Sequence, residues 1–281
     1  MEKEREENMD TAQHNAQCSM FNFQCKKPLV VIKVGGKIVE EDATLQRLLD
    51  DFAAIPGYKV LVHGGGRSAT KVAAKLGIET QMINGRRITD AEMLNVVTMV
   101  YGGLVNKNIV AGLQARAINA LGLTGADLNV LLSDKRPVKD VDYGFVGDVK
   151  QANVEHLASL IHQGVVPVIA PLTHDGKGHL LNTNADTIAG ETAKALAKVF
   201  DVTLVYCFEK PGVLRDEHDD ASVIPSINRE QFREMVVTGV ITSGMIPKLE
   251  NAFGALDAGV SKVYITSSTA IDGQGGTLMI P

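Results

Sequence analysis

The chain has 281 residues, of which 45% are hydrophobic and 22% are charged, as is ordinary for a globular protein with a large core. The net charge of −5 argues against nucleic acid as the main partner. No uninterrupted apolar run approaches the ~20 residues of a membrane-spanning helix, and the three cysteines fit a reducing compartment. We therefore expect a cytoplasmic protein with no membrane partner, built as one large α/β domain or as two lobes.

The first 27 residues are polar and show neither a helical nor a strand period, so they predict a disordered or adventitious extension. His14, Cys18 and Cys25 lie within it, but a fourth metal ligand and a closely spaced ligand pair are lacking. We therefore predict no metal site built from protein side chains.

From residue 28 onward, predicted strands alternate with predicted helices. Strands are expected at residues 30–34, 60–63, 128–132, 144–149, 165–170, 202–207, 262–266 and 277–280. Asp42 is expected to cap one helix, and Ser68 is expected to open another. Further helices are expected from about Asp90, after Asn184, and at residues 154–163, 230–237 and 248–258. Leu76 and Val199 are expected to face the core, and hairpins are expected at Asn84-Gly85 and at residues 174–184. Repeated β-α units predict a mainly parallel central sheet with helices on both faces.

Two of the predicted strands end in glycines. The first runs into Lys33-Val34-Gly35-Gly36, and the second runs into His63-Gly64-Gly65-Gly66. Glycine lets backbone amides approach a ligand closely, and amides at the start of a helix attract anions. Lys33 adds a full positive charge beside them. The two loops therefore predict a site that binds phosphate groups.

The glycine triplet also fits the loose dinucleotide-binding fingerprint, as Gly64-x-Gly66-x-x-Ala69. That fingerprint requires a following strand that ends in an acidic residue, whereas this chain enters the Asn84-Gly85 hairpin. The chain also lacks the G-x-x-x-x-G-K-[ST] sequence of P-loop proteins. Both nucleotide-binding alternatives are therefore disfavoured.

Three further stretches carry polar residues that need a reason. The stretch Asn182-Thr183-Asn184-Ala185-Asp186 precedes a predicted helix, but an N-cap would use only one of its polar residues. Arg86 and Arg87 lie in the predicted hairpin and form either a basic turn or a guanidinium fork for a carboxylate. Lys248 would be an ordinary solvated helix residue if it had no part in the chemistry.

Five motifs, taken in order, make the chain resemble the N-acetyl-L-glutamate kinases, a branch of the amino acid kinase family. They are Lys33-Val34-Gly35-Gly36, His63-Gly64-Gly65-Gly66, Asn84-Gly85-Arg86-Arg87-Ile88-Thr89, Asn182-Thr183-Asn184-Ala185-Asp186 and Gly244-Met245-Ile246-Pro247-Lys248. The resemblance covers about residues 29–281. It implies ATP-dependent phosphorylation of the γ-carboxylate of an N-acylated glutamate, most simply N-acetyl-L-glutamate, to an acyl phosphate in arginine biosynthesis.

The resemblance also implies an architecture: an open αβα sandwich with two lobes. Residues 28–170 would form the lobe that binds the acyl amino acid and dimerises, and residues 171–281 would form the ATP-binding lobe. A homodimer would assemble through the N-terminal lobe, using the long helix after Thr89.

Within that architecture, the catalytic roles carried over by the resemblance fall on three residues. Lys33 would touch the transferring phosphoryl group from the acceptor side, and Lys248 would touch it from the nucleotide side. Asp186 would lie between the two lysines and hold both ammonium groups in place. The phosphate oxygens would be bound by the backbone amides of Gly35, Gly36, Gly65 and Gly66. Because the attacking carboxylate is already ionised, such a reaction needs positioning and charge stabilisation rather than a general base.

On the substrate side, the resemblance places Gly65 and Gly66 against the acyl amino acid. Arg87 would grip the α-carboxylate, and Asn182 would help to bind the acylated amine. Mg²⁺ would arrive with ATP and bridge its phosphates, mostly through water, because the sequence offers no dedicated carboxylate cluster.

The sequence departs from the family pattern at two places. After the ATP-lobe strand it has Cys207-Phe208-Glu209-Lys210-Pro211-Gly212-Val213, with Glu209 in place of the usual aspartate, which puts the adenine-side contacts in doubt. Residues 266–281 lack the longer His- and Glu-containing segment of arginine-inhibited relatives, and Phe21 and Phe23 follow a strand period rather than a helical one. We therefore predict a homodimer that free arginine does not inhibit.

Two other functions stay open on the sequence alone. The chain is compatible with a related kinase for N-succinylglutamate or N-acetyl-aminoadipate, because acyl pockets are built from scattered residues. It is also compatible with a non-catalytic ligand sensor on the same fold, although Lys33, Asp186 and Lys248 count against that function.

Overall fold

The computed structural model describes residues 26–83, 85–241, 245–273 and 275–281. Several sequence predictions lie outside the described residues. They concern the extension at residues 1–25 with its candidate ligands His14, Cys18 and Cys25, and the motif residues Asn84 and Gly244.

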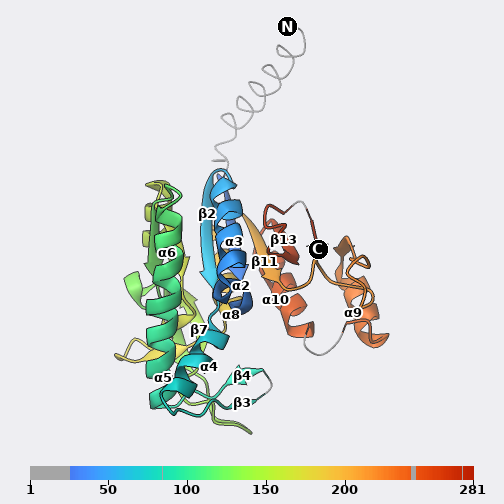
Figure 1. Cartoon of the computed structure of the whole chain (residues 1–281). Helices are drawn as coiled ribbons and strands as arrows, with labels where there is room; N and C mark the ends of the chain where they lie inside the picture. The colour runs from blue at the N-terminus through green and yellow to red at the C-terminus, as the bar shows by residue number, and fades with distance from the viewer. Residues whose placement is uncertain (1–25, 84, 242–244, 274) are drawn as a thin grey trace, which may run out of the picture.

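The described chain is organised around an eight-stranded sheet with the order β12-β14-β13-β11-β1-β2-β8-β5 (Figure 1). Neighbouring strands run parallel throughout, except that β13 and β14 are antiparallel. This confirms the predicted, mainly parallel sheet. The strands are β1 (Pro28–Val34), β2 (Tyr58–His63), β5 (Ala120–Leu123), β8 (Val166–Ile169), β11 (Asp201–Phe208), β12 (Ser226–Ile227), β13 (Lys262–Ser267) and β14 (Thr277–Met279).

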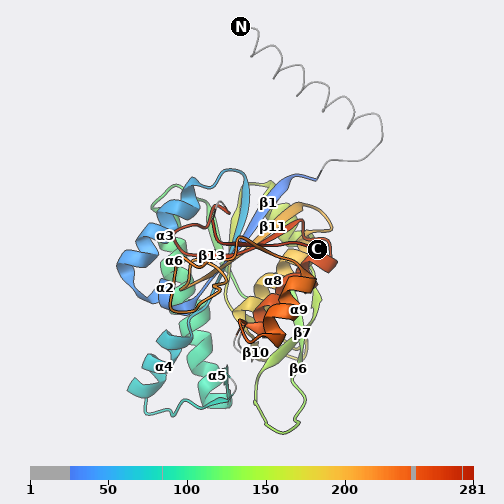
Figure 2. The ribbon, with the colours of Figure 1, turned by 90° about the vertical axis from the view of Figure 1, so that its right-hand side faces the viewer.

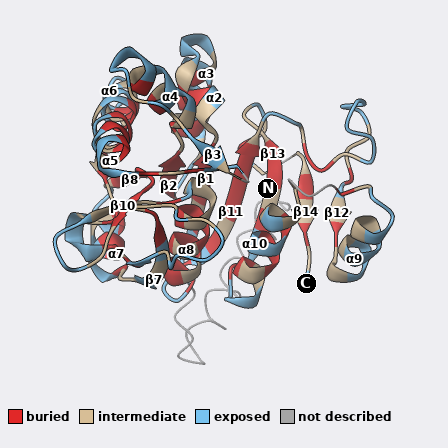
Figure 3. Cartoon of the chain, turned by 90° about the horizontal axis from the view of Figure 1, so that it is seen from below, coloured by how far each residue is buried: buried red, intermediate tan, exposed pale blue. Residues whose placement is uncertain are grey.

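Helices cover both faces of this sheet, which confirms the αβα sandwich (Figure 3). One face carries α2 (Gly36–Glu40), α3 (Asp42–Ala54), α4 (Gly66–Lys75), α5 (Ala91–Val97) and α6 (Asn106–Gln114), and the other carries α7 (Glu155–His162), α8 (Ala185–Leu196) and α10 (Ile246–Asp257). The central strand β1 alternates between the two apolar cores, with Val31 in one and Ile32 in the other. Helix α9 (Arg229–Val237) lies beside β12, at the far edge of the sheet.

A second, four-stranded sheet has the order β10-β9-β6-β7. It contains β6 (Leu131–Lys135), β7 (Gly147–Ala152), β9 (Leu172–His174) and β10 (Leu180–Asn182). The loop joining β6 and β7, together with α4 and α5, projects at one end of the molecule (Figure 2). On either side of the predicted turn, β3 (Met82–Ile83) pairs in antiparallel orientation with β4 (Arg86–Arg87), as expected of a hairpin.

Several boundaries differ from the prediction. Glu41, not Asp42, occupies the N-cap position of α3, and α4 begins at Gly66 rather than at Ser68. Leu76 and Val199 are exposed rather than buried, because each lies past the last full turn of its helix.

Two strand predictions also need correction. The strand expected at 128–132 is displaced to β6, because Asp127–Asn129 form a 3-10 turn in which Leu128 has φ of +54°. The strand expected at 144–149 begins later, at Gly147. Strands β5 and β12 are not predicted from the sequence.

The predicted long helix runs continuously from Ala91 to Gln114 and includes a π-helical segment, η1 (Thr98–Val105). Its 24 residues are long and apolar enough, by length and composition alone, to cross a membrane. In this fold the helix is part of the core, because Val97, Ile109 and Leu113 are completely buried against the sheet. Asp90 caps its N-terminus by accepting a hydrogen bond from the Met93 amide at 2.8 Å.

Candidate active site

The two glycine loops lie in direct contact at the carboxyl ends of β1 and β2. The Gly64 amide donates a hydrogen bond to the Val34 carbonyl at 3.0 Å. A Cβ atom on Gly64 would lie 3.0 Å from the Gly36 amide nitrogen, and one on Gly65 would lie 2.8 Å from the Tyr101 ring. Larger residues would therefore force the two loops, or the loop and the ring, apart. The structure thus brings the predicted phosphate-binding amides into one small region.

Lys33 and Asp186 form a largely buried ion pair beside these loops. Lys33 Nζ lies 2.8 Å from Asp186 Oδ1, and the two side chains are 8% and 15% exposed. Lys33 is carried by β1, whereas Asp186 lies in the first turn of α8. The Asn184 side chain caps that helix by accepting from the Asp186 amide at 2.7 Å. In the 182–186 motif, Asn184 is thus the N-cap and Asp186 forms the ion pair with Lys33.

Lys248 approaches the same place from α10. Its Nζ lies 4.0 Å from the centre of the Phe208 ring, and Lys33 Nζ lies 5.0 Å from the same centre. Partial burial lowers the pKa of Lys248, with Lys33 acting in the same direction and Asp186 opposing it. Lys248 therefore interacts electrostatically with both members of the ion pair. Within the described residues, however, the close contact of Asp186 is with Lys33.

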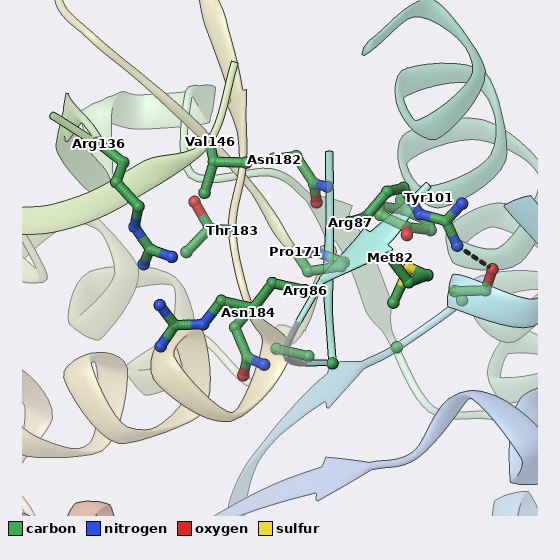
Figure 4. Close-up of a pocket in the computed structure, with 15 residues that line it drawn as sticks. Met82, Arg86, Arg87, Tyr101, Arg136, Val146, Pro171, Asn182, Thr183 and Asn184 are labelled. Atoms are coloured by element: carbon green, nitrogen blue, oxygen red, sulfur yellow. Dashed lines mark hydrogen bonds between the residues drawn. The ribbon is translucent and has the colours of Figure 1, made fainter. Parts of the chain in front are cut away.

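Two cavities flank the glycine loops. The first, of about 210 Å³, is lined by Gly64, Gly65, Gly66, Met82, Gly85, Arg86, Arg87, Tyr101, Arg136, Val146, Pro171, Asn182, Thr183, Asn184 and Ala185 (Figure 4). The second, of about 440 Å³, is lined by Gly35, Gly36, Lys37, Ile38, Gly66, Arg67, Phe208, Glu209, Lys210, Gly212, Met245 and Lys248. Gly66 borders both, so the loops separate a small cavity from a larger one. The small cavity takes residues from both sides of the lobe boundary predicted at residue 170.

Arg87 lines the small cavity, but its guanidinium group also holds the fold together. Its Nη2 atom donates to the Gly66 carbonyl at 2.7 Å and to Thr70 Oγ1 at 2.8 Å, and Nη1 donates to Thr80 Oγ1 at 3.2 Å. The side chain therefore fixes the glycine loop against the hairpin. Its predicted grip on a carboxylate stays a prediction.

Asn182 also lines the small cavity. Its side-chain amide donates to Thr89 Oγ1 at 3.0 Å, which links β10 to the residue that follows the hairpin. Within the described part of the chain, the side-chain oxygen of Asn182 has no hydrogen-bond donor, so it is available to a ligand amide. Its predicted contact with the acylated amine stays a prediction.

A completely buried histidine, His63, supports the second glycine loop, although its role is not predicted from the sequence. Asn106 donates a hydrogen bond from Nδ2 to His63 Nε2 at 3.1 Å, so His63 Nδ1 carries the proton and donates to the Gly64 carbonyl at 2.7 Å. Burial lowers the pKa of His63 to about 4. The ring is therefore neutral at pH 7, and it orients the loop without adding charge.

Glu209, which replaces the aspartate of the family pattern, lies at the mouth of the larger cavity. It accepts hydrogen bonds from Lys37 at 3.0 Å and from Arg67 at 3.1 Å. The Lys37 hydrogen bond is the main reason that the pKa of Glu209 is lowered. Glu209 thereby joins β11 to the two helices that follow the glycine loops.

The sequence also missed Tyr101, Arg136 and Phe208. Tyr101 comes from the π-helical segment, Arg136 follows β6, and Phe208 ends β11. The one sequence feature that these three residues share is their position, since all three lie at the ends or irregularities of elements that surround the glycine loops. Nothing in the local sequence placed these elements around one site.

Comparison with known proteins finds relatives that match most of the chain. Acetylglutamate kinase from Phocaeicola vulgatus is 72% identical over 254 residues, which are 90% of this chain and 99% of the relative. Acetylglutamate kinase from Bacteroides fragilis is 73% identical over 252 residues, which are 90% of this chain and 97% of the relative.

A solved structure of a Streptococcus mutans protein matches with a TM-score of 0.72 and 32% identity, covering 89% of this chain and 98% of that one. The sequence profile described as the amino acid kinase family matches residues 28–267. The paired glycine loops and the flanking lysines thus occur on the fold, and in the sequence context, of known kinases. The chain belongs to the amino acid kinase family.

Proposed function

We propose that this protein is an acetylglutamate kinase, which uses ATP to phosphorylate the γ-carboxylate of N-acetyl-L-glutamate in arginine biosynthesis. The function is supported by the acetylglutamate kinases that are more than 70% identical to it over 90% of its length. The observation that carries the chemistry is the juxtaposition of Lys33, Asp186 and Lys248 with two touching glycine loops.

The reaction joins one γ-carboxylate oxygen to the terminal phosphorus of ATP. The bond between that phosphorus and the oxygen bridging to the next phosphate breaks, and ADP leaves with the bonding electrons. No proton has to be removed, because the carboxylate is ionised at neutral pH. The demands on the protein are therefore alignment of the two substrates and stabilisation of the charge on the transferring group.

The side chains divide that work as follows. Lys33, held by Asp186, neutralises the oxygens of the transferring group from the acceptor side. Lys248 acts from the larger cavity and stabilises the charge that develops on ADP. The phosphate oxygens receive hydrogen bonds from the amides of Gly35, Gly36, Gly65 and Gly66.

The small cavity takes the acyl amino acid, and the larger one takes the phosphates of ATP. Arg87 and Asn182 orient the α-carboxylate and the acylated amine. Gly65 and Gly66 form the wall along which the γ-carboxylate approaches the phosphate. The two lobes divided at position 170 stay a proposal, in which each substrate contacts residues of both lobes, because both cavities take residues from either side of that position.

Mg²⁺ enters this scheme with ATP. Among the described residues, no three His, Cys, Asp or Glu side chains gather into a metal-binding group. Amides and ammonium groups suit phosphate oxygens, so the ion would be held by the ATP phosphates and by water, where it neutralises phosphate charge.

The test is direct detection of the acyl phosphate. Purified protein is incubated with Mg-ATP and N-acetyl-L-glutamate, ADP release is followed, and hydroxylamine traps the product as a hydroxamate. N-acetyl-L-glutamine, which lacks the γ-carboxylate, is the matched negative control and should give no hydroxamate. Binding of both substrates without hydroxamate would point to the ligand sensor instead.

We also propose that the enzyme acts in the cytoplasm as a homodimer. The long helix that was expected to mediate dimerisation exposes Met99 and Leu104, which are 54% and 52% exposed in the single chain. Large apolar side chains on a helix surface are suited to burial against a second copy.

A further inference from the structure

The small cavity contains more positive charge than the proposed substrate requires. Three guanidinium groups border it, from Arg86, Arg87 and Arg136. N-acetyl-L-glutamate carries two carboxylates, and the γ-carboxylate must lie at the glycine loops and Lys33. One arginine is enough for the α-carboxylate, and the acetyl methyl group needs none. Two arginines are therefore unexplained by the proposed function, on which this inference rests.

The two unexplained arginines lie together, away from Arg87. Figure 4 shows Arg87 and Arg136 at opposite ends of the cavity, with Pro171 between them. In the same view, the guanidinium group of Arg86 points toward the Arg136 end. A ligand held at Arg87 by its α-carboxylate would thus direct its other end toward Arg86 and Arg136.

Arg136 is positioned by neighbours that leave one of its donors free. Its Nε atom donates to both carboxylate oxygens of Asp148 at 3.1 Å, and Nη2 donates to the same carboxylate. Its guanidinium carbon lies 5.5 Å from the centre of the Tyr143 ring. Its Nη1 atom is buried and has no hydrogen-bond partner. A buried guanidinium nitrogen without an acceptor is costly, so a ligand oxygen there would be favourable.

Arg86 adds a second, uncompensated charge. It is exposed on β4, and within the described residues no ion pair joins it to a carboxylate. Asp148 therefore offsets only one of the two guanidinium groups. Together they form an electropositive end of the cavity that suits an anion.

The space beyond these arginines allows a longer ligand. Arg86 and Arg136 also line an adjoining cavity of about 480 Å³, with Pro137, Lys139, Asp140, Val141, Tyr143 and Asp148 as its other walls. Because both arginines border both cavities, a chain that extends past the acetyl position would pass between them.

We propose that the acyl end of the site recognises an acyl group that terminates in a carboxylate, which Arg86 and the free Nη1 of Arg136 bind together. The preferred substrate class is then an N-acyl-L-glutamate made from a dicarboxylic acid, and the four-carbon N-succinyl-L-glutamate is the simplest probe. The phosphoryl transfer itself is unchanged, since the same γ-carboxylate attacks ATP.

The test compares kcat/KM for three substrates with saturating Mg-ATP: N-acetyl-L-glutamate, N-succinyl-L-glutamate and N-succinamyl-L-glutamate. The last replaces the terminal carboxylate by an amide of the same shape. We expect N-succinyl-L-glutamate to exceed both others by about tenfold or more, as a charge-assisted hydrogen-bonded pair provides. Equal values for the succinyl and succinamyl substrates would overturn the proposal.

Variants then locate the recognition. Arg86→Leu and Arg136→Met should each lower the ratio of the succinyl to the acetyl kcat/KM by about tenfold. Arg47→Leu is the matched control, because Arg47 is exposed on α3 and lines neither cavity, and it should leave the ratio unchanged. If the two variants weaken both substrates equally, the arginines bind the α-carboxylate and the proposal is wrong.

These outcomes are separable from failure of the proposed function. An enzyme that converts N-acetyl-L-glutamate without preferring the succinyl compound keeps the proposed function and loses this inference. A protein that forms no hydroxamate with any of the three substrates loses both.

Discussion

Replacing Lys33 by alanine is the most direct perturbation of the proposed phosphoryl-transfer site. The Lys33 side chain is 8% exposed and lies 2.8 Å from Asp186, so its charge is already oriented before substrate binds. Removing one preorganised electrostatic group typically costs about 3 to 4 kcal/mol of transition-state stabilisation. We expect Lys33→Ala to lower kcat about a hundredfold to a thousandfold with a much smaller change in KM. Steady-state kinetics with the hydroxamate assay measures both.

The structure also predicts a loss of stability that must be separated from the loss of activity. Lys33→Ala leaves the Asp186 carboxylate, 15% exposed, without its cation, which costs about 3 kcal/mol or somewhat less. Thermal unfolding of each variant is therefore measured alongside its kinetics. Lys150→Ala, which removes an exposed lysine on β7, is the control. If Asp186 works by holding Lys33, Asp186→Asn should reduce kcat less in the Lys33→Ala background than in the wild type. A folded Lys33→Ala enzyme with near-normal kcat would refute the assigned role.

Three further predictions follow from the site and its surroundings. Arg87→Lys should raise KM for the acyl amino acid with little change in KM for ATP, since an ammonium group cannot reproduce the fork; unchanged substrate affinity by calorimetry would argue for another carboxylate clamp. The free energy of unfolding should fall as the pH drops from about 6.5 to about 4, because the depressed pKa of His63 makes the unfolded state bind its proton first. Over that pH range the free energy of unfolding should change by up to about 3 kcal/mol. In denaturant titrations at several pH values, His63→Gln should lose this part of the pH dependence. Light scattering should give the mass of a homodimer, and Leu104→Lys should convert it to a monomer. In the activity assay, free arginine should not inhibit the enzyme. A six-subunit mass or inhibition by arginine would contradict this prediction.

The contact between the two glycine loops could be predicted because its signals are local. Parallel strands place their carboxyl ends at one edge of a sheet, so two strands that both end in glycine must bring their loops together. The structure confirms that contact between Gly36 and Gly64. The polar stretch that contains Asn184 and Asp186 was expected directly before a helix, and the structure places both residues at the start of α8. The role of Asp186 beside Lys33 came from the family resemblance rather than from this reasoning.

Other parts of the fold could not be predicted, because their signals are weak or depend on distant residues. The missed edge strand β5 is Ala-Leu-Gly-Leu, and glycine weakens a strand pattern. Yet Gly122 is required there, since a Cβ atom would lie 1.9 Å from Asn106 Oδ1. The role of Arg136 depends on Asp148 in the partner strand and on a cavity assembled from several distant segments of the chain. A single sequence gives no information on such convergence.

The two halves of the site are linked by contacts of unequal strength. The buried link is Lys33 with Asp186, supported by β1 and β11, which pair in register along seven residues. The exposed link is Glu209 with Lys37 and Arg67, whose side chains are all more than 50% exposed. Exposed pairs contribute about 1 kcal/mol or less, so the catalytic geometry depends on the sheet and the buried pair. The exposed cations border the cavity assigned to the ATP phosphates, where a phosphate can replace the Glu209 carboxylate at small cost. In this proposal, Glu209 is a counter-ion that holds Lys37 and Arg67 beside the cavity until ATP binds. Because these pairs are weak, the two cations can then move to the phosphates.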